Sequence, residues 1–178
     1  ARRPGHGYKR TEDQKPLPRG GIEEAITEKK QVEAELQQSQ TLFQQAEAMG
    51  NMGYWCWDLK EDKLVSCSDR YALSDDMTVP EALDYFVSTE AELGLVHPDD
   101  RAFVKQALYD VSEQLKELDI EYRVITLLGN TRYILDRSEF VYDNDGTPSR
   151  LFGIFQDITA NTEKEINLIQ ATKEAQET

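Results

Sequence analysis

The chain has 178 residues, of which 39% are hydrophobic and 30% are charged, which suits one domain with extensions that face water. Its formal net charge of -14 predicts repulsion from nucleic acid, so we expect no nucleic-acid partner. No apolar run approaches the roughly 18 residues that a membrane-crossing helix needs, and no signal-peptide core is present. We therefore expect no membrane contact by these residues and a cytoplasmic location, although a parent protein could be membrane-anchored.

The first 21 residues contain Pro4, Pro16 and Pro18, scattered charges and no hydrophobic periodicity. Such a composition cannot bury enough apolar surface to offset the cost of ordering the chain. We expect a disordered linker or tether here, and the sequence does not distinguish a native linker from an added segment.

Residues 22–49 predict one helix, because they contain no Gly or Pro and their apolar residues recur at alternating spacings of three and four. This seam suits a coiled coil, and it predicts a homodimer through the N-terminal helix. A single amphipathic helix packed on its own domain would show a similar stripe, so both arrangements remain open. The seam candidates are Ile22, Ala25, Val32, Leu36 and Phe43.

A hairpin and short helices are expected next. Residues 54–59 predict a strand with alternating aromatic side chains, and residues 64–68 predict the return strand. A short helix over 69–73 follows. Thr78 and Glu81 have the spacing of a capping box, which predicts a second helix start.

The longest internal helix is expected to open at His97–Arg101, with Pro98 at its first position. Three strands then follow at about 119–128, 131–142 and 149–158. Their apolar residues predict a sheet that is apolar on both faces, with internal helices on one face and the 22–49 helix or a partner chain on the other. The stripe of the long helix comprises Phe103, Val104, Ala107, Leu108, Val111 and Leu115.

Four stretches, in this order and spacing, resemble the PAS domain in its subclass with a C-terminal PAC region. They are residues 53–59 (GYWCWDL), 96–101 (VHPDDR), 121–124 (EYRV) and 153–159 (GIFQDIT). The resemblance implies an α+β fold over residues 50–159, with a five-stranded antiparallel sheet and helices on one face. Amphipathic, coiled-coil helices would flank it, and an output helix would start at 160–178.

The chain departs from the family pattern in three places, one of which is the strand–helix junction after Ser68, where the Gly-Tyr pair that the family often has is missing. The turn after the EYRV strand has Leu128-Gly129-Asn130 where the family usually has Asp-Gly, although Gly129-Asn130 also suits a tight turn. Residues 75–95 resemble nothing specific. In this family that region often shapes the ligand pocket, so the resemblance names no ligand.

The resemblance implies a sensory and dimerisation module of a signal-transduction protein. In PAS proteins the triplet at Asp157, Ile158 and Thr159 couples the sheet to an output helix, and Thr159 could also be that helix's N-cap. The implied C-terminal effector is a two-component histidine kinase, or next a diguanylate cyclase or phosphodiesterase. The alternative is a ligandless PAS adaptor that serves only dimerisation or protein–protein interaction.

The sequence supplies no catalytic or metal-binding motif, so we expect no catalysis and no metal in this fragment, whereas the parent could be an enzyme. His97, at a helix start, suits a haem ligand poorly, and the cysteine motif of flavin photoadducts is absent. A non-covalent flavin is compatible with the aromatic residues, although nothing requires a cofactor. The pocket-lining candidates are Trp55, Trp57, Tyr71, Phe86 and Tyr122.

Overall fold

The computed structural model describes residues 19–177. The predicted tether therefore falls mostly outside the described residues, and helix α1 (Arg19–Gly50) begins at Arg19 rather than at residue 22. The chain divides into two compact units, one up to Leu42 and one from Phe43 onward. In the first unit the described residues are helical throughout.

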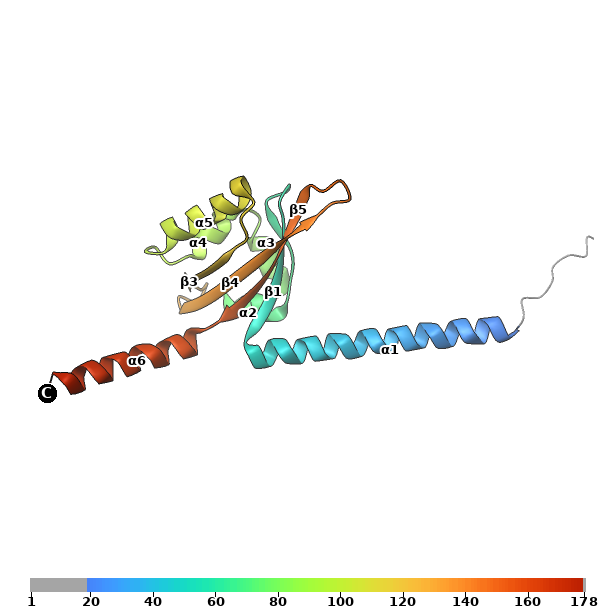
Figure 1. Cartoon of the computed structure of the whole chain (residues 1–178), viewed down its shortest axis with the longest axis horizontal. Coiled ribbons are helices and arrows are strands. Elements are labelled where there is room, and N and C mark those ends of the chain that lie inside the picture. Colours follow the sequence, from blue (N-terminus) through green and yellow to red (C-terminus); the bar gives the residue numbers. More distant parts are fainter. Residues whose placement is uncertain (1–18, 178) are drawn as a thin grey trace, which may run out of the picture. The chain divides into compact units, whose positions relative to one another are not determined.

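The second unit contains a five-stranded antiparallel sheet with the order β2-β1-β5-β4-β3 (Figure 1). The strands are β1 (Met52–Asp58), β2 (Lys63–Cys67), β3 (Asp119–Ile125), β4 (Thr131–Tyr142) and β5 (Pro148–Asp157). The helices are α2 (Asp69–Ser74), α3 (Val79–Tyr85), α4 (Thr89–Leu95), α5 (Arg101–Gln114) and α6 (Thr159–Gln176). This arrangement confirms the predicted α+β architecture.

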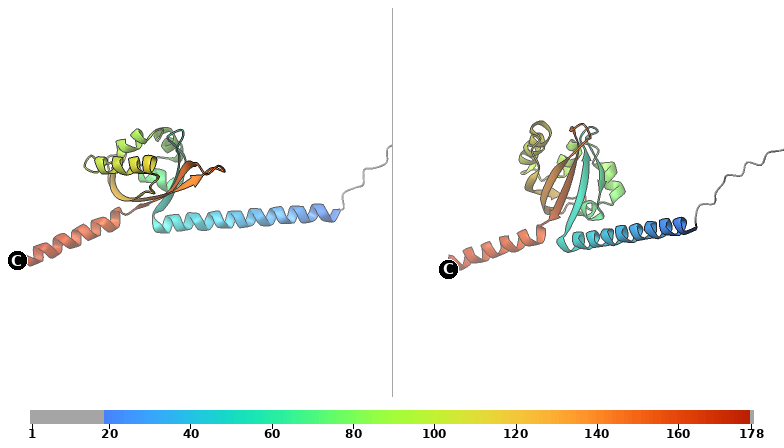
Figure 2. Two further views of the ribbon diagram at one scale, coloured as in Figure 1. Left: turned by 45° about the horizontal axis from the view of Figure 1, so that its top comes forward. Right: turned by 45° about the vertical axis from the view of Figure 1, so that its right-hand side comes forward.

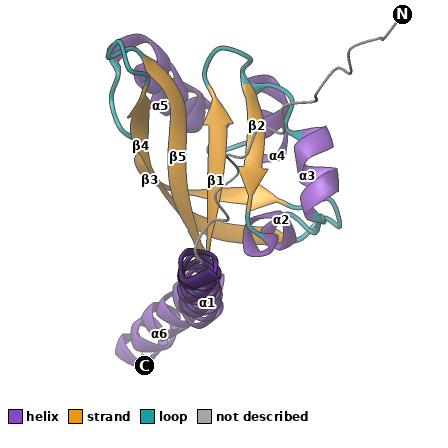
Figure 3. Ribbon diagram, turned by 90° about the vertical axis from the view of Figure 1, so that its right-hand side faces the viewer, coloured by secondary structure: helices purple, strands orange, loops and turns teal. Residues whose placement is uncertain are grey.

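Helices α2 to α5 cover one face of the sheet (Figure 2 and Figure 3). Alternate residues of β5 divide between the two faces, as a strand's period of two requires. Leu151 and Phe155 are buried under the helices, whereas Phe152 and Ile154 are partly exposed on the opposite, outer face. The prediction of apolar groups on both faces is confirmed.

The outer face carries an aromatic contact to the end of α1. The rings of Tyr54 and Phe152 stack with centroids 6.0 Å apart, and Phe43 lies 6.1 Å from Tyr54. Val141 and Tyr142 leave further apolar surface exposed on the neighbouring strand.

Two helix predictions differ from the structure. Helix α4 was not expected, and it begins where the Ser88 side chain accepts a hydrogen bond from the Ala91 N–H. Pro98 precedes the longest internal helix instead of opening it, because residues 97–100 form a turn and α5 starts at Arg101. The capping box of Thr78 and Glu81 is confirmed at the start of α3.

Helix α5 buries a narrower stripe than expected. Val104 and Val111 are buried, whereas Phe103 and Leu115 are exposed. Leu115 follows the helix in a left-handed conformation with φ of 52°, so its side chain leaves the helical stripe. None of the helices in residues 19–177 is long and apolar enough to cross a membrane.

Candidate functional site

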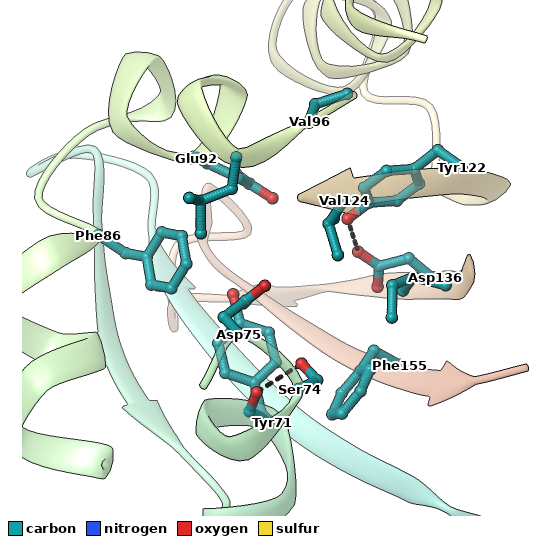
Figure 4. Close-up of a pocket in the computed structure, with 12 residues that line it drawn as sticks. Tyr71, Ser74, Asp75, Phe86, Glu92, Val96, Tyr122, Val124, Asp136 and Phe155 are labelled. Carbon is teal, nitrogen blue, oxygen red and sulfur yellow. Dashed lines mark hydrogen bonds between the residues drawn. The ribbon is translucent and has the colours of Figure 1, made fainter. Parts of the chain in front are cut away.

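A small cavity of about 20 Å³ lies in the core between the sheet and helices α2 to α4 (Figure 4). That volume holds about one water molecule. Phe86 and Phe155 form part of its apolar wall. Its polar lining comes from Tyr71, Ser74, Asp75, Glu92, Tyr122 and Asp136.

Three of the five aromatic pocket candidates line the cavity, and two do not. Tyr71, Phe86 and Tyr122 line the cavity. Trp55 does not line the cavity, but its indole N–H donates a hydrogen bond to Asp136, which does. Trp57 does not line the cavity, and its indole N–H donates to Asp62 Oδ1 at 3.1 Å.

Asp136 of β4 is the best-anchored carboxyl group of the cavity, with only 3% of its surface exposed. Trp55 Nε1 donates to Oδ1 at 2.8 Å, and the Tyr122 hydroxyl donates to Oδ2 at 3.2 Å. Burial raises the pKa of Asp136 to about 7, and these two hydrogen bonds only partly oppose that effect. The group therefore holds a proton up to near neutral pH.

Gly153 fixes the position of the Trp55 indole. The two residues face each other across β5 and β1, and a Cβ atom at Gly153 would lie 2.0 Å from Trp55 Cε2. A side chain here would displace the ring that donates to Asp136. The glycine that opens the GIFQDIT stretch is thus required by close packing.

Asp75 and Glu92 complete the acidic lining. Asp75, directly after α2, is 7% exposed, and Glu92 of α4 is half-buried. Burial raises the pKa of Asp75 to about 7 and that of Glu92 to about 8, and neighbouring carboxylates add to both shifts. Sequence reasoning missed this cluster, because burial of a carboxyl group depends on long-range packing.

The relay candidates lie where β5 passes into α6. Thr159 is not the N-cap as predicted, because it is the first residue of α6 and its hydroxyl oxygen accepts from the Tyr133 N–H at 2.9 Å. The N-cap position is Ile158, which makes no side-chain capping bond, and Asp157 just before it satisfies the first amide of α6, because its Oδ1 accepts from the Thr159 N–H at 3.0 Å and from the Thr159 hydroxyl. The Ile158 N–H donates to Tyr133 O at 2.9 Å.

Arg132 connects this junction to the neighbourhood of the cavity. Its guanidinium contacts Asp157 Oδ2 at 3.5 Å and Asp76 Oδ1 at 2.8 Å. Asp76 directly follows the cavity residue Asp75 and adopts a left-handed conformation with φ of 62°. A short path of ionic contacts therefore leads from beside the cavity to the start of α6.

The end of α1 meets the same junction. The Asp157 N–H donates to Asn51 O at 3.0 Å, and Asn51 Nδ2 donates to Asp157 O at 3.1 Å. Gln156 Nε2 donates to Gly50 O at 2.8 Å. The last residue of α1 and the first of α6 are thus held by adjacent residues of β5.

Two of the four stretches that carry the family resemblance also bind each other. Asp100, from VHPDDR, accepts from Nε and Nη2 of Arg123, from EYRV, at 2.9 and 2.6 Å. These hydrogen bonds lower the pKa of Asp100. His97 lies at this contact and is not among the cavity residues, and its Nδ1 accepts from the Asp99 N–H at 3.2 Å.

The seam candidates of α1 present apolar surface along the helix. Ile22, Val32 and Leu36 are exposed in the single chain, as is Ala25. Phe43, in the second unit, contacts Tyr54 but remains about half exposed. Either of the two predicted arrangements of this helix would cover such a surface.

Comparison with known proteins identifies the globular unit. The family model described as PAS fold matches residues 82–155. The structure of a sensory box histidine kinase/response regulator from Burkholderia thailandensis has a TM-score of 0.59 and 28% identity, covering 76% of this chain and 98% of that chain. This chain contains a PAS domain.

Curated relatives carry the PAS similarity as part of longer proteins. Sensor protein FixL of Bradyrhizobium diazoefficiens is 32% identical over 124 residues, which is 69% of this chain and 23% of FixL. A blue-light-activated histidine kinase of Brucella anthropi is 25% identical over 155 residues, or 87% of this chain and 30% of the kinase. The chain thus spans less than a third of the length of these two relatives.

The cavity of this PAS domain does not fit a flavin or a haem. Pockets for ligands of that class enclose roughly 300–1,000 Å³, whereas this cavity measures about 20 Å³. Phe86 and Phe155 are almost completely buried beside it, so the core would have to open to admit a ring system.

Proposed function

We propose that this PAS domain is the sensory and relay module of a longer signalling protein, passing a conformational change through Asp157, Ile158 and Thr159 to a C-terminal effector. The junction carries the proposal, because Asp157 bonds the end of α1, the start of α6 and, through Arg132, the residue beside the cavity. A histidine kinase is the favoured effector, since two of the proteins compared are histidine kinases. A diguanylate cyclase or phosphodiesterase is the next choice. Enzymatic activity would belong to that effector.

The proposed mechanism is a change in the salt bridges of Arg132. A ligand, a redox change or an upstream movement of α1 that shifts Asp75 would also shift Asp76, its neighbour in the chain. The salt bridge between Arg132 and Asp157 would then change, and the Asp157 carboxylate also accepts a hydrogen bond from the first turn of α6. A two-state junction of this kind needs only a few kcal/mol between its states.

Asp157→Ala is expected to change effector output while the domain stays folded. The substitution removes the cap of α6 and the contact to Arg132, and losing a helix cap costs about 0.5–2 kcal/mol locally. We expect faster amide exchange at the first turn of α6 in this chain. We also expect a changed output level in the intact protein, and Thr159→Ala should act in the same direction.

Asp145→Ala is the matched control. Asp145 also accepts a backbone hydrogen bond two residues ahead, from Thr147, but in an exposed turn away from α6. Unchanged output in both the Asp157 and Thr159 variants would refute the relay, and an equal change in the control would show that the effect is not specific to the junction.

We also propose that the exposed seam of α1 forms a homodimer. Val32→Asp combined with Leu36→Asp introduces charges into the seam, and it should convert a dimer into a monomer in light scattering. Ala34→Asp, on the opposite side of the same helix, controls for the lower helix propensity of Asp and should remain dimeric. A dimer that survives the double substitution would exclude this helix as the main interface.

A ligandless adaptor is the second candidate function. The small cavity and the partly exposed outer face of Phe152, Ile154 and Val141 favour it, because such a face suits contact with another protein. Binding of a ligand in the cavity would favour the sensor, because an adaptor needs no ligand.

A further inference from the structure

The cavity has more hydrogen-bond acceptors than donors. We call the group formed by Asp75, Glu92 and Asp136 the acidic cavity. Figure 4 shows the carboxyl groups of Asp75 and Glu92 directed into the same space that Asp136 borders. Within residues 19–177, hydrogen-bond donors are found for the Asp136 carboxyl group, but none for those of Asp75 and Glu92.

No positive charge in the described part of the chain lines this space. Arg132 is the cation that influences Asp75, but its guanidinium is bound by Asp76 and Asp157. Asp75 is only 7% exposed, and no oxygen of Asp75 or Glu92 is among the fully buried side-chain atoms without a partner in the described residues, so these oxygens are accessible to a group the size of water in the cavity. A buried carboxylate without a partner is costly, and it is stabilised either by a proton or by a cation that donates hydrogen bonds.

We propose that the acidic cavity binds a small ammonium-type cation, either free ammonium or the end of a small primary amine. A cavity of about 20 Å³ accepts a group the size of one water molecule, and an ammonium group has that size. Its N–H bonds would supply donors to Asp75 and Glu92, which have none. The residues that the structure describes include no cluster arranged to hold a metal ion.

Protons compete with this cation for the same carboxyl groups. The pKa values of Asp75 and Asp136 are raised to about 7 and that of Glu92 to about 8, so the cavity is largely protonated at low pH. The cation should therefore bind more tightly at pH 8 than at pH 6. The other titratable or charged groups that act on these three are Asp62, Tyr71, Asp76, Tyr122 and Arg132.

Binding of an ammonium group in the acidic cavity would be a signal that the domain could pass on. An ammonium group would hold Asp75 in its ionised form, next to Asp76 and its salt bridge to Arg132. The use of this site as a signal rests on the proposed function, whereas binding itself does not. The two are tested separately, because Asp157 lies outside the cavity lining.

The test is thermal unfolding of the full 178-residue chain in ammonium, methylammonium or potassium chloride at equal concentrations and pH 8. Potassium has nearly the size of ammonium but no N–H donors, so it controls for size and ionic strength. We expect Tm to be higher in ammonium than in potassium by about 4 °C once ammonium exceeds its dissociation constant several-fold. The difference should shrink at pH 6. A Tm shift with both ammonium and methylammonium would indicate that the site accepts the end of a primary amine. A Tm shift with ammonium alone would indicate that it binds the free ion.

Asp75→Asn and Glu92→Gln should each abolish the difference, while Glu90→Gln, an exposed carboxylate on the same helix, should retain it. Far-ultraviolet circular dichroism identifies any variant that fails to fold, and proton NMR of ¹⁵N-labelled ammonium detects bound cation in the unaltered chain. Equal Tm values in ammonium and potassium, or a difference that both cavity variants retain, would overturn the proposal. Asp157→Ala should keep the ammonium effect, so a failed relay and a failed site give different results.

Discussion

Phe155→Ala is expected to cost about 3–5 kcal/mol in the free energy of unfolding. Phe155 is 2% exposed, its ring centroid lies 5.3 Å from that of Tyr71, and it also borders the acidic cavity. Removing the ring would join a new void to the existing cavity and leave Tyr71 without its edge-on partner. Because single domains are stable by only about 5–15 kcal/mol, urea unfolding should show a large fall in the midpoint.

Phe152→Ala is the matched control for this prediction. It removes the same side chain from the same strand, but from the outer face, where Phe152 is 40% exposed and its one aromatic partner within residues 19–177 is Tyr54. We expect a cost of about 1 kcal/mol or less, mainly from the lost aromatic contact. Equal losses in the two variants would contradict the assignment of an inner and an outer face.

The sequence was sufficient to predict elements whose signals are local. The bounds of β4 match the predicted 131–142, and the capping box at Thr78 is present, because strand alternation and capping depend on neighbouring residues. Helix α4 has its N-cap at Ser88, but its seven residues are too few to show a clear period. The predicted helix start at Pro98 was wrong, because residues before α5 form a turn in which Asp100 contacts Arg123, 23 residues away.

The candidate site was less predictable than the fold for the same reason. The aromatic residues Tyr71, Phe86 and Tyr122 were expected to line a pocket, and they do border the cavity. Nothing local marks Asp75, Glu92 or Asp136 as buried, since each lies in a different element and they meet only when the sheet and helices pack. The capping role of Asp157 in place of Thr159 likewise depends on Tyr133, which binds the Thr159 oxygen from β4.

The stability of the chain is expected to fall as pH rises from about 5 to about 8 in a buffer free of amines and ammonium. The three acidic-cavity groups have folded-state pKa values raised to about 7 or 8, whereas in the unfolded chain they ionise near pH 4. Between those values the folded state binds more protons than the unfolded state, so stability decreases with pH. We expect a slope in urea unfolding that is steeper than one group alone would give, since one such group contributes at most about 1.4 kcal/mol per pH unit and three set an upper limit of about 4.

Carboxylates with lowered pKa values make stability rise with pH, but they do so over a lower pH range. Hydrogen bonds lower the pKa of Asp76 and of Asp100, and stability from such groups is lost only below about pH 4. They therefore do not cancel the fall between pH 5 and pH 8.

Asp75→Asn combined with Glu92→Gln should flatten the slope of stability against pH, whereas Glu90→Gln should leave it unchanged. A rise in stability over this range, or an unaltered slope in the double variant, would show that these carboxyl groups are not buried together. The flattening would arise because the two amides carry no proton to lose, leaving Asp136 as the one cavity group that still titrates in this range.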